Sequence, residues 1–194
     1  MNLKRAAIVL TICGLVACSG LAFGDSSPGA TQNNLPFPSY GTGTVVVRIY
    51  TDYFCPPCRA VEPQLEPLLI DLVKSRKITV TFVDTPIYND SQVYARHLLY
   101  ALNKKNDFEH ALYVRSILFE AAAGKVDKDA LEEYLKGKDI LLRRFNVKPV
   151  STRLNGLLQG DNVGGTPSCV IVKDGKFDKR VGGGEILKAL KELQ

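Results

Sequence analysis

The feature that most constrains the fold is the run Cys55-Pro56-Pro57-Cys58, which joins a strand-like segment to a helix-like one. Residues 45–50 (Val-Val-Val-Arg-Ile-Tyr) are nearly all apolar and predict a buried strand. Beyond the second cysteine, apolar residues recur at helical spacing as far as residue 74, and residues 78–83 alternate as a second strand does. This order predicts a βαβ unit with a parallel strand pair and a right-handed crossover.

Helical periodicity dominates the middle of the chain. We expect helices over 91–104, 108–123, 128–136 and 151–158, with Asp127 as the N-cap of the third. The pattern then returns to strands at 169–172 and 177–181 around an Asp174-Gly175 hairpin turn, and ends in a helix over 186–193. These patterns predict one α/β domain over residues 45–194, with a helical insertion at about 91–160.

The first 17 residues are typical of a secretory signal, because Lys4 and Arg5 precede an apolar run too short for an ordinary membrane span. Two processing sites compete. Residues 15–18 (Leu-Val-Ala-Cys) resemble a bacterial lipobox, in which Cys18 is lipidated and becomes the new N-terminus, whereas residues 22–24 favour cleavage after Gly24. We favour the lipobox. Residues 18–44 are rich in Gly, Ser, Pro, Asn and Thr, which predicts a flexible tether.

Charge gives little reason to expect nucleic acid as a partner. The net charge of +5 falls to +3 once Lys4 and Arg5 leave with the signal, and the remaining charges form no basic stripe. A neutral-to-mildly basic exported domain of this size is large enough for a real hydrophobic core. We therefore look to the cysteines for the chemistry.

The chain has five cysteines, and they divide by position. Cys13 lies in the signal, Cys18 is the lipidation site or is removed, and Cys169 stands alone in a predicted strand as a small core residue. Cys55 and Cys58 form an isolated C-x-x-C. In an oxidising compartment such a pair favours redox activity over a structural role, because a disulfide that closes so short a loop constrains little of the unfolded chain. A permanent local disulfide is the alternative.

The spacing assigns different roles to the two thiols. Cys55 is expected at the N-cap of the helix, with Pro56 in the first turn, where its missing N–H does no harm. There the helix dipole favours the thiolate, which is the attacking species in disulfide exchange. We predict that Cys55 is the nucleophile and that Cys58, one turn further in, is the shielded resolving thiol.

Taken together, these residues resemble the thioredoxin superfamily, and the helical insertion resembles its DsbA-like branch. The resemblance rests on TDYFCPPC (residues 51–58), on FVDTPIYNDSQVYARHLLYAL (residues 82–102) and on Gly165-Thr166-Pro167 before a strand. It covers about residues 45–193. It implies a thioredoxin fold, a central mixed β-sheet flanked by helices, with an inserted all-helical subdomain.

The resemblance also implies further roles at the site. Thr166-Pro167 becomes a cis-proline loop packed against Cys55, with the Thr166 backbone free to pair with a substrate strand. The only redox group is the Cys55–Cys58 disulfide; no metal or other cofactor is expected.

Two departures from the family pattern concern the acid–base groups of the site. Strongly oxidising relatives carry a histidine between the cysteines, whereas Pro56 and Pro57 supply neither a cation nor an N–H, so we predict a weaker oxidant. Many relatives carry a buried acid where this chain has Ile49. Asp52 either shapes the turn or handles protons through water, and we favour the turn.

The leading functional hypothesis is a bacterial, periplasmic thiol:disulfide oxidoreductase that acts on cysteine-containing exported proteins through a mixed disulfide on Cys55. We expect a monomer, with a membrane redox partner. An oxidase would be reoxidised by a quinone-linked partner, and a reductase supporting cytochrome c maturation would draw electrons through a membrane protein. A third hypothesis is a lipid-tethered metal-binding or chaperone module with the C-x-x-C as ligands, although His97 and His110 lack ligand spacing to the cysteines.

Overall fold

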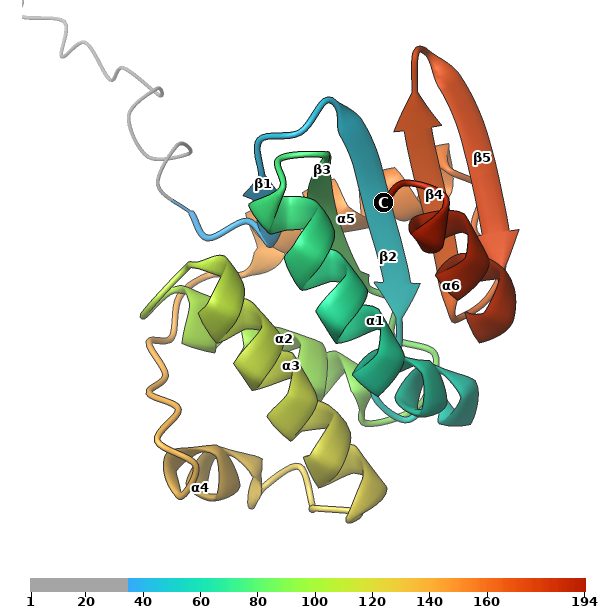
Figure 1. The fold of residues 1–194 in the computed structure, drawn as a ribbon. Coiled ribbons are helices and arrows are strands. Elements are labelled where there is room, and N and C mark those ends of the chain that lie inside the picture. Colours follow the sequence, from blue (N-terminus) through green and yellow to red (C-terminus); the bar gives the residue numbers. More distant parts are fainter. Residues whose placement is uncertain (1–34) are drawn as a thin grey trace, which may run out of the picture. The chain divides into compact units, whose positions relative to one another are not determined.

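The computed structural model describes residues 35–194, which form a five-stranded mixed sheet in the order β1-β3-β2-β4-β5 (Figure 1). The strands are β1 (Ser39–Gly41), β2 (Val45–Thr51), β3 (Ile78–Asp84), β4 (Ser168–Lys173) and β5 (Lys176–Val181). β2 and β3 pair in parallel, as the βαβ pattern predicted, and the other three pairings are antiparallel. The predicted thioredoxin fold is confirmed.

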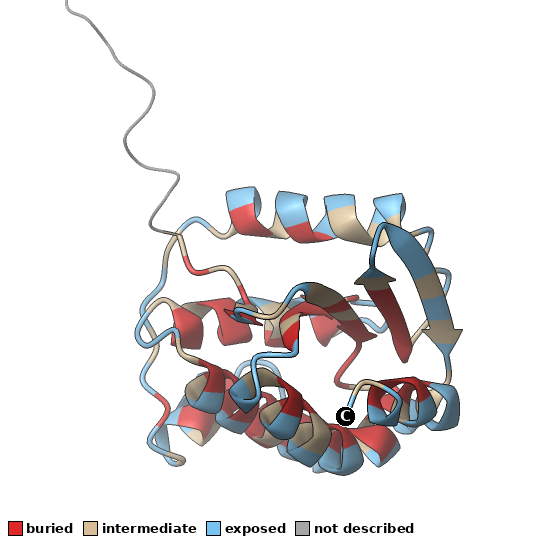
Figure 2. Cartoon of the chain, turned by 45° about the horizontal axis from the view of Figure 1, so that its top comes forward, coloured by how far each residue is buried: buried red, intermediate tan, exposed pale blue. Residues whose placement is uncertain are grey.

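Helices cover both faces of this sheet. They are α1 (Pro56–Lys74), α2 (Ser91–Leu102), α3 (Phe108–Ala123), α4 (Leu131–Lys136), α5 (Lys148–Gly160) and α6 (Gly183–Lys191). α1 and α6 lie on one face and α5 on the other, with buried residues concentrated between the layers (Figures 1 and 2). Under α5, Val150 and Leu154 pack against Tyr50, Val83 and Val170 of the sheet. Part of the predicted insertion, namely α5, therefore belongs to the layer that flanks the sheet.

The predicted tether differs from the structure at its end. Ser39–Gly41 form strand β1, antiparallel to β3, and Tyr40 is buried against Phe82 and Phe108. The prediction of a tether as far as residue 44 is therefore wrong over this strand. This strand has only three residues, held by backbone hydrogen bonds and one buried ring. Its sequence is therefore too short to show a hydrophobic period. The predicted signal, the lipobox with Cys18 and both cleavage sites lie outside the described residues.

Smaller differences occur at helix ends. The prediction of Asp127 as the N-cap of the third helix is wrong, because α4 begins at Leu131 after Ala130, and the Asp127 side chain accepts from the Asp129 N–H in the turn before it. The Asp174-Gly175 turn is confirmed, with positive φ values of 51° and 72°. Within residues 35–194 no helix has the length and apolarity to cross a membrane.

Candidate active site

The cysteine motif lies where β2 ends and α1 begins. Cys55 is the N-cap residue of α1 in an extended conformation, and prolines occupy the first positions of the helix. This placement confirms the helix start expected from the sequence. The Cys55 side chain makes no capping hydrogen bond to the helix, and neither Pro56 nor Pro57 has an N–H to offer it. The position of the predicted nucleophile is therefore poor in backbone donors.

The two thiols lie in contact, and the inner one is the more shielded. The Cys58 thiol donates to Cys55 Sγ across 2.8 Å, and no disulfide bond joins the two sulfurs. Cys58 is fully buried, whereas Cys55 retains 3% exposure. Burial, reinforced by the hydrogen bond to Cys55, raises the pKa of the Cys58 thiol to about 12. Cys58 thus holds its proton firmly at neutral pH, as a resolving thiol does between turnovers.

The Thr166-Pro167 loop lies against the outer thiol. The Cys55 thiol donates to the Thr166 carbonyl oxygen at 3.4 Å, although the two residues are 111 positions apart in the chain. The peptide bond between Thr166 and Pro167 is cis. The loop is closed by the Ser168 hydroxyl, which donates to the Gly165 carbonyl at 2.6 Å. The fold thereby brings the predicted loop and the predicted nucleophile together.

Asp52 organises the loops around the motif. Its buried carboxylate accepts hydrogen bonds from the Phe54 N–H at 2.8 Å and from the Ser91 hydroxyl at 2.8 Å. It also accepts from the backbone N–H groups of Ile87 at 2.6 Å and Tyr88 at 3.4 Å. One side chain therefore joins the cysteine loop to the β3–α2 loop. Of the two roles left open for Asp52, shaping the turn is the one these contacts perform.

A buried ionic network lies beneath the same turn of α1, and sequence reasoning missed it. The fully buried Arg115 of α3 donates to both carboxylate oxygens of Glu62, at 3.0 and 2.9 Å, and to the Thr51 hydroxyl at 3.2 Å. Its Nη1 lies 3.5 Å from an oxygen of Asp84. The guanidinium carbon lies 4.2 Å from the centre of the Phe82 ring. Two acids and one base are thus buried together.

Burial changes the acidity of both acids in this network. It raises the pKa of Asp84 to about 7, although the Arg115 charge and a hydrogen bond from the Tyr53 hydroxyl, at 3.2 Å, oppose the rise. Burial also raises the pKa of Glu62 against the opposing charge of Arg115. One available signal was that Glu62 follows Cys58 by four residues, which places both on one face of a helix. Nothing in the sequence pairs either acid with Arg115.

The remaining candidate residues lie in the core. Cys169 is buried in β4 opposite Ile49, as predicted, and burial raises its pKa to about 12. His97 places Nδ1 2.8 Å from the Val93 carbonyl oxygen. In the part of the chain that the structure describes, no three His, Cys, Asp or Glu side chains are grouped to hold a metal ion.

The aromatic residues in and near the motif divide into core and rim. Tyr53 and Phe108 are buried in the core, whereas Phe54 is half-buried and meets Tyr94 edge-on. The exposed apolar side chains near the motif come instead from the loop that Asp52 anchors: Ile87 is 57% and Tyr88 48% exposed.

Comparison with solved structures supports the fold. A periplasmic thioredoxin-like protein from Salmonella enterica serovar Typhimurium matches with a TM-score of 0.61 and 20% identity over 84% of this chain and 92% of its own. The catalytic domain of Proteus mirabilis ScsC matches with a TM-score of 0.61 and 19% identity, over 84% of this chain and 91% of its own. Pseudomonas aeruginosa DsbA2 matches with a TM-score of 0.56 and 17% identity, over 81% of this chain and 94% of its own. No curated protein matches the sequence.

A thioredoxin fold with two thiols in contact at the first turn of α1 is the architecture of a thiol:disulfide oxidoreductase. A family model described as thioredoxin matches residues 42–192, and the chain belongs to the thioredoxin family.

Proposed function

We propose that this protein exchanges disulfides with cysteine-containing exported proteins through a mixed disulfide on Cys55. The observation that carries the proposal is the contact of the Cys55 and Cys58 sulfurs at 2.8 Å, with Cys55 also against the Thr166 carbonyl. A contact of this kind needs little movement to become a disulfide. Catalysis then requires no external cofactor, because the electrons are stored in the two thiols.

In the oxidising direction the reaction has two steps. A client thiolate attacks Cys55 Sγ, a client–Cys55 disulfide forms, and the Cys55–Cys58 bond breaks with Cys58 as the leaving thiolate, which takes up a proton. A second client thiolate then attacks the client sulfur, so that the client gains a disulfide and Cys55 leaves as thiolate. Reduction of a client disulfide is the reverse sequence.

The client is held beside Cys55 by two kinds of surface. The Thr166 backbone, half-buried in the loop just before β4, offers strand-like hydrogen bonds to an extended client segment. Ile87 and Tyr88 offer exposed apolar contact on a loop fixed by the Asp52 hydrogen bonds. Both surfaces are generic, which suits an enzyme that recognises unfolded chains.

The double proline makes the Cys55–Cys58 disulfide a mild oxidant. The absence of a capping hydrogen bond to Cys55, together with the missing N–H groups of Pro56 and Pro57, leaves the reduced state with little stabilisation of a Cys55 thiolate. This observation also keeps a reductase, supplied with electrons by a membrane protein, as the second candidate. The oxidase would instead be reoxidised by a quinone-linked membrane partner.

Export to the periplasm, with attachment through a lipid on Cys18, completes the proposal. It is supported by the signal-like first 17 residues and the lipobox at residues 15–18. Labelling of the expressed full chain with a radioactive fatty acid tests the anchor. Label lost in a Cys18→Ser variant is expected, and an unlabelled wild-type chain would contradict the lipidation.

The decisive experiment is the reduction potential of the Cys55–Cys58 couple in a glutathione titration, run beside insulin reduction and oxidation of reduced ribonuclease. We expect a potential lower than that of strongly oxidising DsbA proteins, whose value is about −120 mV. Cys55→Ser should abolish both activities, and Cys58→Ser should accumulate the mixed disulfide. Cys169→Ala, a change at a buried thiol outside the site, is the matched control. Retained activity in Cys55→Ser, or stoichiometric metal in the anaerobically purified protein, would contradict the proposal.

A further inference from the structure

The buried network under α1 has an unbalanced charge. Glu62 and Asp84 bring two carboxyl groups, whereas Arg115 brings one positive charge, and the side chains of all three are at most 10% exposed. With both acids ionised the cluster would carry an uncompensated negative charge in the protein interior, which is costly. One bound proton makes the cluster neutral. The interior beneath the active-site turn therefore favours a stored proton.

The contacts show which acid holds that proton. Glu62 receives two hydrogen bonds from Arg115 and has the geometry of an ionised partner. Asp84 receives no hydrogen bond from Arg115: one of its oxygens lies 3.5 Å from Arg115 Nη1, and the other accepts a hydrogen bond from the Tyr53 hydroxyl at 3.2 Å. Asp84 Oδ1 and Arg115 Nη1 both lack a hydrogen-bond partner among residues 35–194. The proton thus belongs on Asp84, in agreement with its raised pKa of about 7.

The network lies within one helical turn of the resolving thiol. Cys58 and Glu62 are four residues apart on the buried face of α1, so their side chains are neighbours. Thr51 and Asp84 are paired in register at the ends of β2 and β3, and Arg115 contacts both of them. Arg115 therefore links Asp84, through Glu62, to the turn of α1 that carries Cys58.

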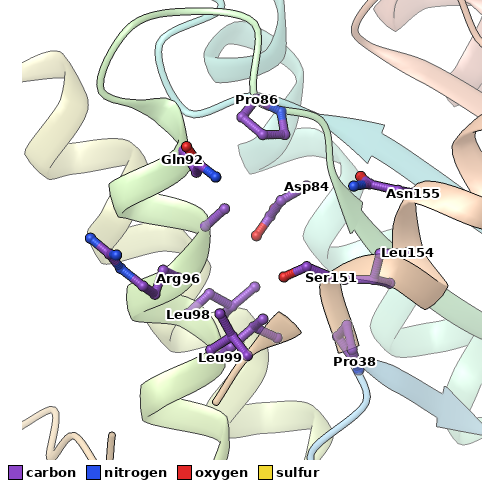
Figure 3. A pocket seen from close by; sticks show the side chains of 12 residues that line it. Pro38, Asp84, Pro86, Gln92, Arg96, Leu98, Leu99, Ser151, Leu154 and Asn155 are labelled. Atoms are coloured by element: carbon purple, nitrogen blue, oxygen red, sulfur yellow. The ribbon is translucent and has the colours of Figure 1, made fainter. Parts of the chain in front are cut away.

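Asp84 also borders a pocket on the side away from the client. The pocket has a volume of about 150 Å³ and lies between α2 and α5. Figure 3 shows the Asp84 carboxyl group directed into it, near Gln92 of α2 and Ser151 of α5. Thr166 and the client surface lie beside β4, whereas Asp84 ends β3, and β2 separates these two strands. The pocket thus offers water a separate approach to the network.

We propose that Asp84 supplies the proton that Cys58 takes up when the disulfide opens, and that it is reprotonated from solvent through the pocket between α2 and α5. This inference rests on the proposed function. In the oxidising direction the Cys58 thiolate becomes a thiol and the Asp84 carboxylic acid becomes a carboxylate, and a proton from water restores the acid. In the reducing direction the same proton moves back. Because the route avoids the Cys55 face, it stays open while a client covers that face.

Other ionisable groups surround Asp84 and set its titration. They come from the segment after β2, from α1, from α3 and from the pocket rim on α2, while α5 contributes only neutral side chains. These groups are Asp52, Tyr53, Glu62, Arg115 and Arg96. Glu62 raises the pKa of Asp84, and Arg115 and Tyr53 lower it.

The test is the rate at which a small thiol of known pKa opens the disulfide, measured from pH 5.5 to 8.5 and expressed per thiolate. In the wild type the rate constant should fall about tenfold from pH 6 to pH 8, because the protonated fraction of a group with a pKa of about 7 changes by that factor. Asp84→Asn should give a flat profile. Asp161→Asn, a change in a buried ion pair on the opposite face of the sheet, is the matched control and should keep the wild-type profile. A sloping profile in Asp84→Asn would overturn the proposal.

Two further measurements separate a proton role from a structural one. Glu62→Gln removes a negative neighbour, so the inflection should move to lower pH rather than vanish. Carbon-13 NMR of the Asp84 carboxyl should show one signal that moves near pH 7, also in a Cys58→Ser mixed disulfide with a cysteine peptide. An Asp84 signal that titrates only near pH 4 would contradict the role of Asp84 as proton donor. A signal that enters slow exchange when the peptide is bound would contradict reprotonation through the pocket between α2 and α5. Neither result would affect the exchange activity of Cys55, which its own serine variant tests.

Discussion

The two faces of the sheet each bury an ionic cluster, and the clusters differ in their charge balance. Under α5, Arg48 donates to both oxygens of Asp161, at 2.6 and 2.7 Å, and Tyr50 donates to the same carboxylate. One positive and one negative charge cancel, and no buried polar side-chain atom of this group lacks a partner within residues 35–194. Under α1, Arg115 faces two acids and leaves two atoms unpartnered.

This difference separates a structural cluster from one that can do chemistry. The balanced pair gains nothing by accepting a proton, since protonation would break good hydrogen bonds. The unbalanced network gains by accepting one, and it lies beside the thiols. The same residue types therefore serve different purposes according to their charge count and their distance from Cys58.

The largest expected effect comes from removing the cation on each face. Arg115→Met leaves two buried acids without a counter-charge and should destabilise the protein by about 3–5 kcal/mol. Arg48→Met should cost less, because the Arg48 side chain is 18% exposed and a single carboxylate is left behind. Urea unfolding at pH 7 measures both. Equal losses would mean that the charge imbalance has no energetic consequence.

A smaller effect is expected in the pH dependence of stability. The folded state raises the pKa of Asp84 from an ordinary value to about 7, so between these values the folded chain binds the extra proton. Its contribution is therefore present at low pH and is lost as the pH rises towards 7, by about 3 kcal/mol between pH 5 and pH 8. The free energy of unfolding of the wild type minus that of Asp84→Asn should fall by this amount. A difference that stays constant with pH would contradict the stored proton.

The smallest effect concerns the two tyrosines that donate to these acids. Tyr50→Phe and Tyr53→Phe each remove one hydrogen bond to an aspartate and should cost about 1 kcal/mol. Only Tyr53→Phe should move the pH profile of disulfide opening, to higher pH, because its hydroxyl lowers the pKa of Asp84. The thiol-opening assay compares the pair directly, and a shift of the same size in Tyr50→Phe would show a general effect of loosening the core.

Sequence patterns predicted the parts of the fold that depend on local periodicity. The parallel pair around α1, the helix start at Cys55 and the Asp174-Gly175 turn follow from residue spacing and from backbone preferences. The short strand β1 was not predictable, because its stability comes from one buried ring and from pairing with β3.

The site was predictable to a similar extent. The motif and its resemblance indicated Cys55, Cys58 and the Thr166-Pro167 loop. The Arg115 network was not predictable, because α3 meets β2 and β3 only through tertiary packing. The sequence around a single arginine in an apolar helix does not indicate which acid it will pair with. The hydrogen bonds of Asp52 to residues 35 or more positions away are hidden for the same reason.

The exposed prolines between the cysteines have a consequence for how long a client remains bound. Pro56 and Pro57 present rings without N–H groups on one flank of Cys55, so for the proposed clients that flank offers no backbone donor. Under the proposed function, we expect this lack of donors to give a client a short residence time and the site little preference for sequence. The proposed mixed disulfide on Cys55, rather than non-covalent affinity, would then decide which clients stay long enough to react.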